Sequence, residues 1–228
     1  MNVLVIETSS EQLSLALAHA GSVHVFEQIV GNRHAELVLP EIERLLATAG
    51  AAIGTLDAVV FGAGPGAFTG LRIACGVAQG LALPRNLPVL GVGTLEALAE
   101  GAFAEDPGAN RVIACIDARM GEIYHAAYRR DARGWEPLNA PELVLPEELP
   151  VPDDGGWVGC GSGFRAHGAA LALRCGSHLA RVDPDALPHA SAMLRLALPR
   201  LAAGEGKDPA EAVPLYVREK VALKTHER

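Results

Sequence analysis

The segment from Gly62 to Leu83, GAGPGAFTGLRIACGVAQGLAL, constrains the fold of this chain more than any other. It is a glycine-rich turn followed by a helical stretch whose polar residues, from Leu71 onward, are only Arg72 and Gln79. A helix that is apolar on every side needs cover on every side, because a large exposed apolar surface is unfavourable in water. One side can pack on the chain's own sheet. The segment therefore predicts a helix shared between the core of this chain and a partner.

Composition and charge exclude several classes of protein. Half of the 228 residues are hydrophobic, which excludes a disordered chain. The net charge of −8 argues against tight nucleic-acid binding by this chain alone, because phosphate contacts need lysine and arginine. The basic end, with Arg218, Lys220, Lys224 and Arg228, is either a solvated tail or a weak RNA contact. The cysteines are scattered, without a C-x-x-C pair, and the sequence shows neither a signal peptide nor a membrane-spanning run. These features predict a cytoplasmic protein with no membrane attachment.

The apolar periodicities in the first half predict a mixed sheet with helices on its faces. Strands are expected at 3–6, 13–18, 23–29, 57–61 and 89–92, and helices at 35–49, 68–83 and 94–100. Pro40 should kink the first of these helices or mark its effective start. The element order is the ribonuclease H-like order of an α/β fold.

The second half partly repeats this pattern after a polar break at 105–108. Strands are expected at 112–116, 122–128, 135–138 and 156–160, and helices at 164–174 and 190–201. A loop or short helical turn is expected at 141–154. We therefore predict a lobe at 1–107 that carries the partner-binding helices and a smaller ribonuclease H-like lobe at 108–228.

Most local motifs have a structural explanation as good as a chemical one. The turn at 62–67 matches G-x-G-x-x-A, a pattern of dinucleotide-binding turns. Pro65 removes a backbone amide that a pyrophosphate would need, and no acidic residue follows about 20 residues later. A purely structural turn is therefore favoured over a dinucleotide or anion site. His34 has Val38 where a helical metal pair needs a second histidine, so no metal is expected. Asp117, Arg119 and Glu122 surround a turn that either binds a polar ligand or is solvated.

Five segments that span nearly the whole chain form a distinctive set: VLVIETSSEQLSLAL, RHAELVLPEIERLLATAG, the segment around FTGLRI, IDARMGEIY and PLYVREKVA. Together they resemble the TsaB family, the dimerisation subunit of the bacterial machinery that makes threonylcarbamoyladenosine in tRNA. The resemblance implies two ribonuclease H-like lobes, as in actin, sugar kinases and Hsp70.

In the ATPases of that superfamily, hairpin turns hold phosphates at positions that correspond here to 7–10 and 117–121, and a glycine turn that corresponds to 159–163 holds the nucleoside. These turns depart from the ATPase pattern, so the resemblance implies at most a vestigial nucleotide site. Its residues would be Glu7, Thr8, Ser9, Asp117, Arg119 and Gly161. No cofactor is expected for the chain alone, and ATP or ADP would bind only at an interface shared within a complex.

The resemblance also implies a partner. The catalytic paralogue in the family's complex carries an H-x-x-x-H metal site, and the matching stretch here, from His34 to Val38, lacks the second histidine. This chain would be a scaffold with no activity of its own that dimerises with that threonylcarbamoyltransferase. An ATPase would be the third subunit, tRNA would bind only through the complex, and the chain alone would form a homodimer.

The expected interface combines the helix at 34–49 with the helix at 68–83. Its residues are His34, Val38, Leu39, Ile42, Leu45, Leu46, Phe68, Leu71, Arg72, Ile73, Cys75, Gly76, Val77 and Gly80. The alternative is an autonomous small-molecule kinase or ATPase of the same fold. An RNA-binding module is disfavoured by the sign of the charge.

Overall fold

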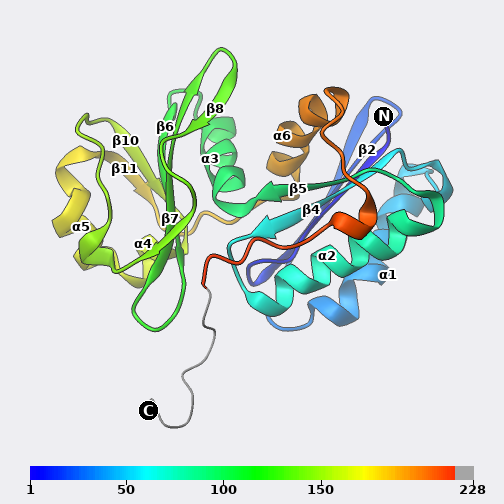
Figure 1. Ribbon diagram of the computed structural model, residues 1–228, viewed down its shortest axis with the longest axis horizontal. Coiled ribbons are helices and arrows are strands. Elements are labelled where there is room, and N and C mark those ends of the chain that lie inside the picture. The colour runs from blue at the N-terminus through cyan, green and yellow to red at the C-terminus, as the bar shows by residue number, and fades with distance from the viewer. Residues whose placement is uncertain (219–228) are drawn as a thin grey trace, which may run out of the picture.

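The first of two α/β lobes is built on a five-stranded sheet in the order β3-β2-β1-β4-β5, and the computed structural model describes residues 1–218 (Figure 1). Strands β1 and β2 pair antiparallel, as do β2 and β3, whereas β1, β4 and β5 run parallel. The strands are β1 (Val3–Glu7), β2 (Gln12–His19), β3 (Ser22–Ile29), β4 (Ala58–Gly64) and β5 (Val89–Gly93).

The second sheet repeats this topology in the order β11-β10-β6-β7-β8, with β9 paired to β7. Again the second strand runs antiparallel to the first, and the last two are parallel to it. The strands are β6 (Arg111–Asp117), β7 (Ile123–Asp131), β8 (Gly134–Pro137), β9 (Glu142–Val144), β10 (Trp157–Cys160) and β11 (Leu179–Asp183). The prediction of two ribonuclease H-like lobes, the fold of actin, sugar kinases and Hsp70, is confirmed.

Helices cover both faces of the first sheet. Residues alternate along β1, so Leu4 and Ile6 pack with α1 and α2 while Val3 and Val5 pack with α6. The α-helices are α1 (His34–Ala49), α2 (Phe68–Ala82), α3 (Thr94–Glu105), α4 (Ser162–Ala166), α5 (Gly168–Cys175) and α6 (Ala190–Ala202). Short 3-10 turns are η1 (Ile53–Thr55), η2 (Leu83–Arg85), η3 (Pro146–Glu148), η4 (Gly176–His178) and η5 (Pro209–Glu211). Within residues 1–218, no helix has the length and apolarity needed to cross a membrane.

Helix α1 runs through Pro40, which therefore does not mark its start. The helix begins at His34, and Pro40 lies exposed inside it. A proline leaves the carbonyl four residues earlier without its helical donor. That residue is Glu36, which is also exposed, so water can take the place of the lost hydrogen bond.

Three further differences from the sequence prediction lie in the second half. The expected helix at 164–174 is two helices separated at His167, whose φ of −126° and ψ of 29° are not helical. The segment 141–154 contains a short helical turn, η3, as the sequence allowed, but also the strand β9, and β11 was not predicted. Each of these elements is short, and short elements carry too few periods of the apolar pattern to be recognised.

Helix α6 belongs spatially to the first lobe, although it lies within 108–228. Its residues Met193, Leu194 and Ala197 pack in one cluster with Val3 and Val5 of the first sheet. The assignment of 190–202 to the second lobe is therefore wrong, because the apolar face of α6 covers the sheet face that α1 and α2 leave open. The division at residue 107, in the connection between α3 and β6, stays a prediction.

A buried carboxylate joins the two lobes. Glu100 of α3 is only 4% exposed and accepts hydrogen bonds from three donors. The donors are Arg130 of β7 at 2.9 Å, Trp135 Nε1 of β8 at 2.9 Å and Arg195 of α6 at 2.7 Å. These contacts tie the second sheet to a helix that covers the first.

We expect Glu100→Gln to destabilise the protein by about 3 kcal/mol, because it leaves two arginines near a buried position without their counter-charge. Urea unfolding would measure this change. Glu105→Gln, at an exposed position of the same helix, is the matched control and should change the unfolding free energy by less than about 0.5 kcal/mol. Equal effects of the two substitutions would contradict this role of Glu100.

Candidate functional site

The inner faces of α1 and α2 belong to the core, not to a surface. Val38, Ile42, Leu45 and Leu46 of α1, with Cys75 of α2, are buried in the cluster that contains Leu4 and Ile6. Leu71 of α2 is also buried. His34 is also buried, and its Nε2 lies 3.2 Å from the carbonyl oxygen of Gln12. Their assignment to a partner interface is wrong for the described structure, because the periodic apolar stripe on each helix packs on the chain's own sheet.

The outer face of the same two helices is exposed, and the remaining predicted interface residues lie there. Leu39 is 49% exposed and Phe68 is 38% exposed. Arg72, Gly76 and Gly80 are also exposed, and Ile73 and Val77 are half-buried. A Cβ placed on Gly76 or Gly80 would meet no atom within 4 Å, so this part of α2 is a low, open surface. We call these residues, Leu39, Phe68, Arg72, Ile73, Gly76, Val77 and Gly80, the outer helical face.

The glycines of the turn before α2 serve close packing. A Cβ on Gly70 would lie 1.9 Å from the carbonyl oxygen of Thr8, and one on Gly66 would lie 2.7 Å from the Cβ of Ser9. The Thr8 hydroxyl donates to the carbonyl of Gly70 at 2.7 Å, and the amide of Ala67 donates to the carbonyl of Ser9 at 2.8 Å. The glycines thus let the turn after β1 lie directly against the start of α2.

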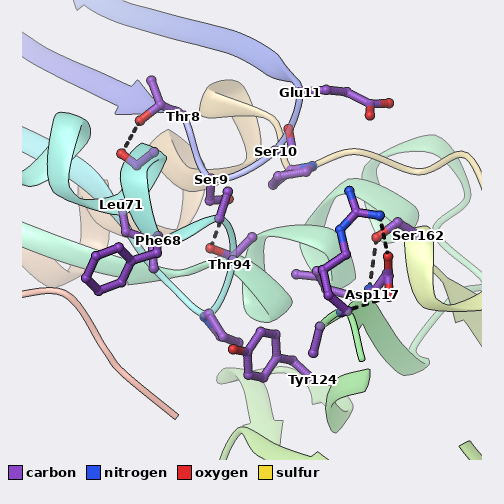
Figure 2. Close-up of a pocket in the computed structure, with 18 of the residues that line it drawn as sticks. Thr8, Ser9, Ser10, Glu11, Phe68, Leu71, Thr94, Asp117, Tyr124 and Ser162 are labelled. Carbon is purple, nitrogen blue, oxygen red and sulfur yellow. Dashed lines mark hydrogen bonds and ion pairs between the residues drawn. The ribbon is translucent and has the colours of Figure 1, made fainter. Parts of the chain in front are cut away.

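A cleft of about 970 Å³ lies between the lobes. Thr8, Ser9, Asp117 and Arg119, all predicted at a vestigial nucleotide site, line it together. Figure 2 shows Thr8, Ser9 and Ser10 on one side and Asp117, Tyr124 and Ser162 on the other. The other two predicted residues, Glu7 and Gly161, are buried and do not line the cleft.

Several residues of the cleft wall were not predicted from the sequence. They are Arg165 of α4, Thr94 of α3 and the segment 215–218. Neither spacing nor periodicity could have placed them there, because each is brought to the cleft by the packing of its element and not by a local pattern.

The polar groups of Asp117 are engaged by its own turn and by two residues of the second lobe, Ser162 and His167. Its Oδ1 accepts from the amide of Arg119 at 3.0 Å, and its Oδ2 lies 3.1 Å from Arg119 Nη1. Its own amide donates to the Ser162 hydroxyl at 3.1 Å. His167 Nε2 lies 3.5 Å from Oδ1. The hairpin turn and α4 therefore hold this carboxylate in place at the edge of the cleft.

Glu7 is fully buried at the end of β1, behind the wall of the cleft. Its Oε1 accepts a hydrogen bond from the amide of Ser9, and its Oε2 has no hydrogen-bond partner among the described residues. Space for the carboxyl group exists only because residue 62 is glycine, since a Cβ there would overlap Oε2. Burial raises the pKa of Glu7 from 4.5 to about 7, although the hydrogen bonds from Ser9 oppose this change.

Metal coordination finds no support in residues 1–218. They contain no group of three or more His, Cys, Asp or Glu side chains that could hold a metal ion. Val38, at the position of the second histidine in an H-x-x-x-H pair, lies in the core.

Comparison with known proteins decides the family. The chain is 39% identical to the "tRNA threonylcarbamoyladenosine biosynthesis protein TsaB" of Escherichia coli, and the alignment covers 98% of this chain and 97% of that protein. The protein of the same name from Haemophilus influenzae is 32% identical, with 98% and 96% covered. The chain belongs to the TsaB family. The resemblance of the sequence segments to this family is thereby confirmed.

Two further comparisons agree with membership of the TsaB family. Residues 25–224 match the family model described as "TsaD: tRNA N6-adenosine threonylcarbamoyltransferase". A solved structure described as "YeaZ from Pseudomonas aeruginosa" is 39% identical, with a TM-score of 0.86 and coverage of 94% of this chain and 99% of that one. The chain is thus similar both to named TsaB proteins and to the family model named for a transferase.

The raised pKa of Glu7 predicts that stability falls as the pH rises from about 4.5 to about 7. Between these values the folded state keeps the proton and the unfolded state has lost it, so a higher pH favours unfolding. The total loss is up to about 3 kcal/mol, since a tenfold change in proton affinity is about 1.4 kcal/mol. Glu7→Gln should remove this loss and be more stable than the parent protein at pH 8.

Urea unfolding between pH 4 and pH 8 measures the effect. Glu11→Gln, in the same turn but exposed, is the matched control and should keep the pH dependence of the parent protein. A Glu7→Gln protein with the same pH profile as the parent would show that Glu7 titrates normally.

Proposed function

We propose that this chain is a non-catalytic subunit that binds and activates a related threonylcarbamoyltransferase in the synthesis of threonylcarbamoyladenosine in tRNA. The observation that carries the proposal is the outer helical face. It is apolar and low around Gly76 and Gly80, and it is exposed on a chain whose relatives are named for this biosynthesis. Association would bury this face, which favours binding because apolar surface leaves water.

The identity of the partner rests on shared fold. The match of residues 25–224 to the family model named for the transferase supports a partner with equivalent helices in its own first lobe. Equivalent helices can meet face to face as four helices around a pseudo-twofold axis. Two copies of this chain can use the same surface, so we propose a homodimer when the transferase is absent. An ATPase would be the third subunit, and tRNA would bind only through the complex, in the cytoplasm.

The absence of catalysis by this chain alone is part of the proposal. His34 is buried against β2, with its Nε2 at the carbonyl of Gln12, and Val38 packs in the core. These positions would need two exposed histidines to hold a metal on the helix. We propose that the chain has no cofactor of its own and that ATP or ADP binds, if at all, at an interface shared within the complex.

Gly76→Arg directly tests whether the outer helical face binds the transferase. Because a side chain at position 76 meets nothing within the chain, the substitution should leave the fold intact while it fills the space of a partner helix. We expect the affinity for the transferase to fall about thirtyfold or more, as at a hot-spot position. Calorimetry with the purified transferase measures this affinity, and reconstituted tRNA modification should fall in parallel.

Leu173→Arg is the matched control for added charge. Leu173 lies on α5 of the second lobe and is almost fully exposed, so its replacement should leave affinity unchanged. Sedimentation equilibrium of each variant alone reports on the homodimer. A folded Gly76→Arg protein that binds the transferase like the parent would show that the outer helical face is not the interface.

The cleft favours one alternative, an autonomous kinase or ATPase, because it lies between the two lobes and hydroxyl groups line it. The engagement of Asp117 by Arg119 and the burial of Glu7 argue against this alternative, since neither carboxylate is free to hold a magnesium nucleotide. We expect calorimetry of the isolated chain to show no saturable, magnesium-dependent ATP binding. Saturable binding that is lost in Asp117→Asn would establish the alternative.

A further inference from the structure

The segment 212–218 runs along α2 toward the second lobe (Figure 1). At its start, the carbonyl of Ala212 accepts from Cys75 Sγ at 3.3 Å and from Gln79 Nε2 at 3.0 Å. The amide of Leu215 donates to the carbonyl of Ala63 at 2.7 Å. The segment is therefore fixed to the first lobe by main-chain as well as side-chain contacts.

Tyr216 continues this attachment at the start of α2. Its ring lies 5.5 Å from the ring of Phe68, and its hydroxyl accepts from Arg72 Nε at 3.1 Å. The guanidinium of Arg72 also lies over the Phe68 ring, 4.0 Å from its centroid. These three side chains form one stacked group at the mouth of the cleft.

Arg218, two residues later, is bound by the second lobe. Its side chain is only 14% exposed, and its Nη2 lies 2.5 Å from Glu122 Oε2. Nη2 also lies 3.5 Å from the carbonyl oxygen of Arg119, and Nη1 lies 3.6 Å from Met120 Sδ. All three partners belong to the turn between β6 and β7, so one arginine joins this turn to a segment held by the first lobe.

The backbone of that turn has an unfavourable conformation. Arg119 and Met120 have φ angles of 62° and 58°, in the left-handed region that residues with a side chain seldom adopt. Two successive residues of this kind cost free energy, which the surrounding contacts must offset. In this conformation the carbonyl of Arg119 and the carboxylate of Glu122 both reach the guanidinium of Arg218.

We propose that residues 212–218 form a releasable latch that holds the two lobes at one separation and partly closes the cleft. The latch supplies Leu215, Tyr216, Val217 and Arg218 to the cleft wall, so its release would widen the entrance. Release begins at Arg218, because this residue holds the second lobe through one ion pair and weaker contacts. The freed segment then separates from the first lobe back through the single hydrogen bond of the Leu215 amide, as far as Ala212, whose carbonyl accepts two hydrogen bonds. The latch does not depend on the proposed partner.

The exchange of the Leu215 amide with solvent tests the latch in the full chain. Arg218→Ala and Glu122→Gln each remove one side of the ion pair, and each should speed this exchange about tenfold or more, the effect of losing a charge-assisted hydrogen bond to a partly buried group. Arg133→Ala is the matched control, because Arg133 is 88% exposed in the turn between β7 and β8 and, among residues 1–218, pairs only with Asp131. High salt should speed exchange in the parent protein and not in Arg218→Ala.

The separation of the lobes provides a second measurement. All four native cysteines are buried, so spin labels can be placed selectively at cysteines introduced at exposed Ala35 and Leu173, one in each lobe. We expect the distance distribution to broaden in Arg218→Ala and to stay narrow in Arg133→Ala. The proposal would be overturned if the Leu215 amide exchanged at the parent rate in both Arg218→Ala and Glu122→Gln. It would also be overturned if Arg133→Ala changed that rate as much as these two variants do.

Discussion

The relative position of the two lobes depends on the buried carboxylate of Glu100. Apolar packing between α3, α6 and the second sheet favours contact but specifies no single orientation, because the hydrophobic effect is not directional. A buried charge is tolerated only where donors surround it, and here the donors come from β7, β8 and α6. The rotation of α3 about its axis is thereby fixed. Since α3 begins at Thr94, whose hydroxyl lies 3.4 Å from that of Ser9, the same constraint extends to the wall of the cleft.

The two faces of α2 explain how a helix with so few polar residues can lie at a surface. Its inner face carries Leu71, Cys75 and the alanines at 74, 78 and 82, all buried. On its outer face, Gly76 and Gly80 expose little apolar area, Ile73 and Val77 are half-buried, and the guanidinium of Arg72 lies over the ring of Phe68. The exposed surface is therefore smaller than the sequence composition indicates. What distinguishes it is its flatness, which suits close approach of another helix.

Local sequence patterns were sufficient to predict the helices and strands of the first lobe and the order of most strands, because those strands are long, apolar and separated by clear turns. They were not sufficient for α6, whose periodicity predicts a helix at 190–201 but carries no information about which sheet it covers. The same limit affected the prediction of the interface residues. Val38 and Ile42 belong to the clearest apolar stripe of α1, and such a stripe marks the side that packs on the sheet. The exposed residues of α1 and α2 are the ones between the stripes, where periodicity gives no signal.

The two turns that face each other across the cleft have one chemical property in common. In the first, the amide of Ser9 donates to the carboxylate of Glu7, and in the second, the amide of Arg119 donates to that of Asp117. A turn that binds phosphate presents such amides to the ligand. Here each turn supplies its own acceptor, so these amides are not available to an external anion. The glycine turn before α2 is used in a similar way, since its close contact is with the backbone of Thr8. The Thr8 side chain and the Ser9 backbone instead contact the start of α2, so the turn after β1 supports that helix.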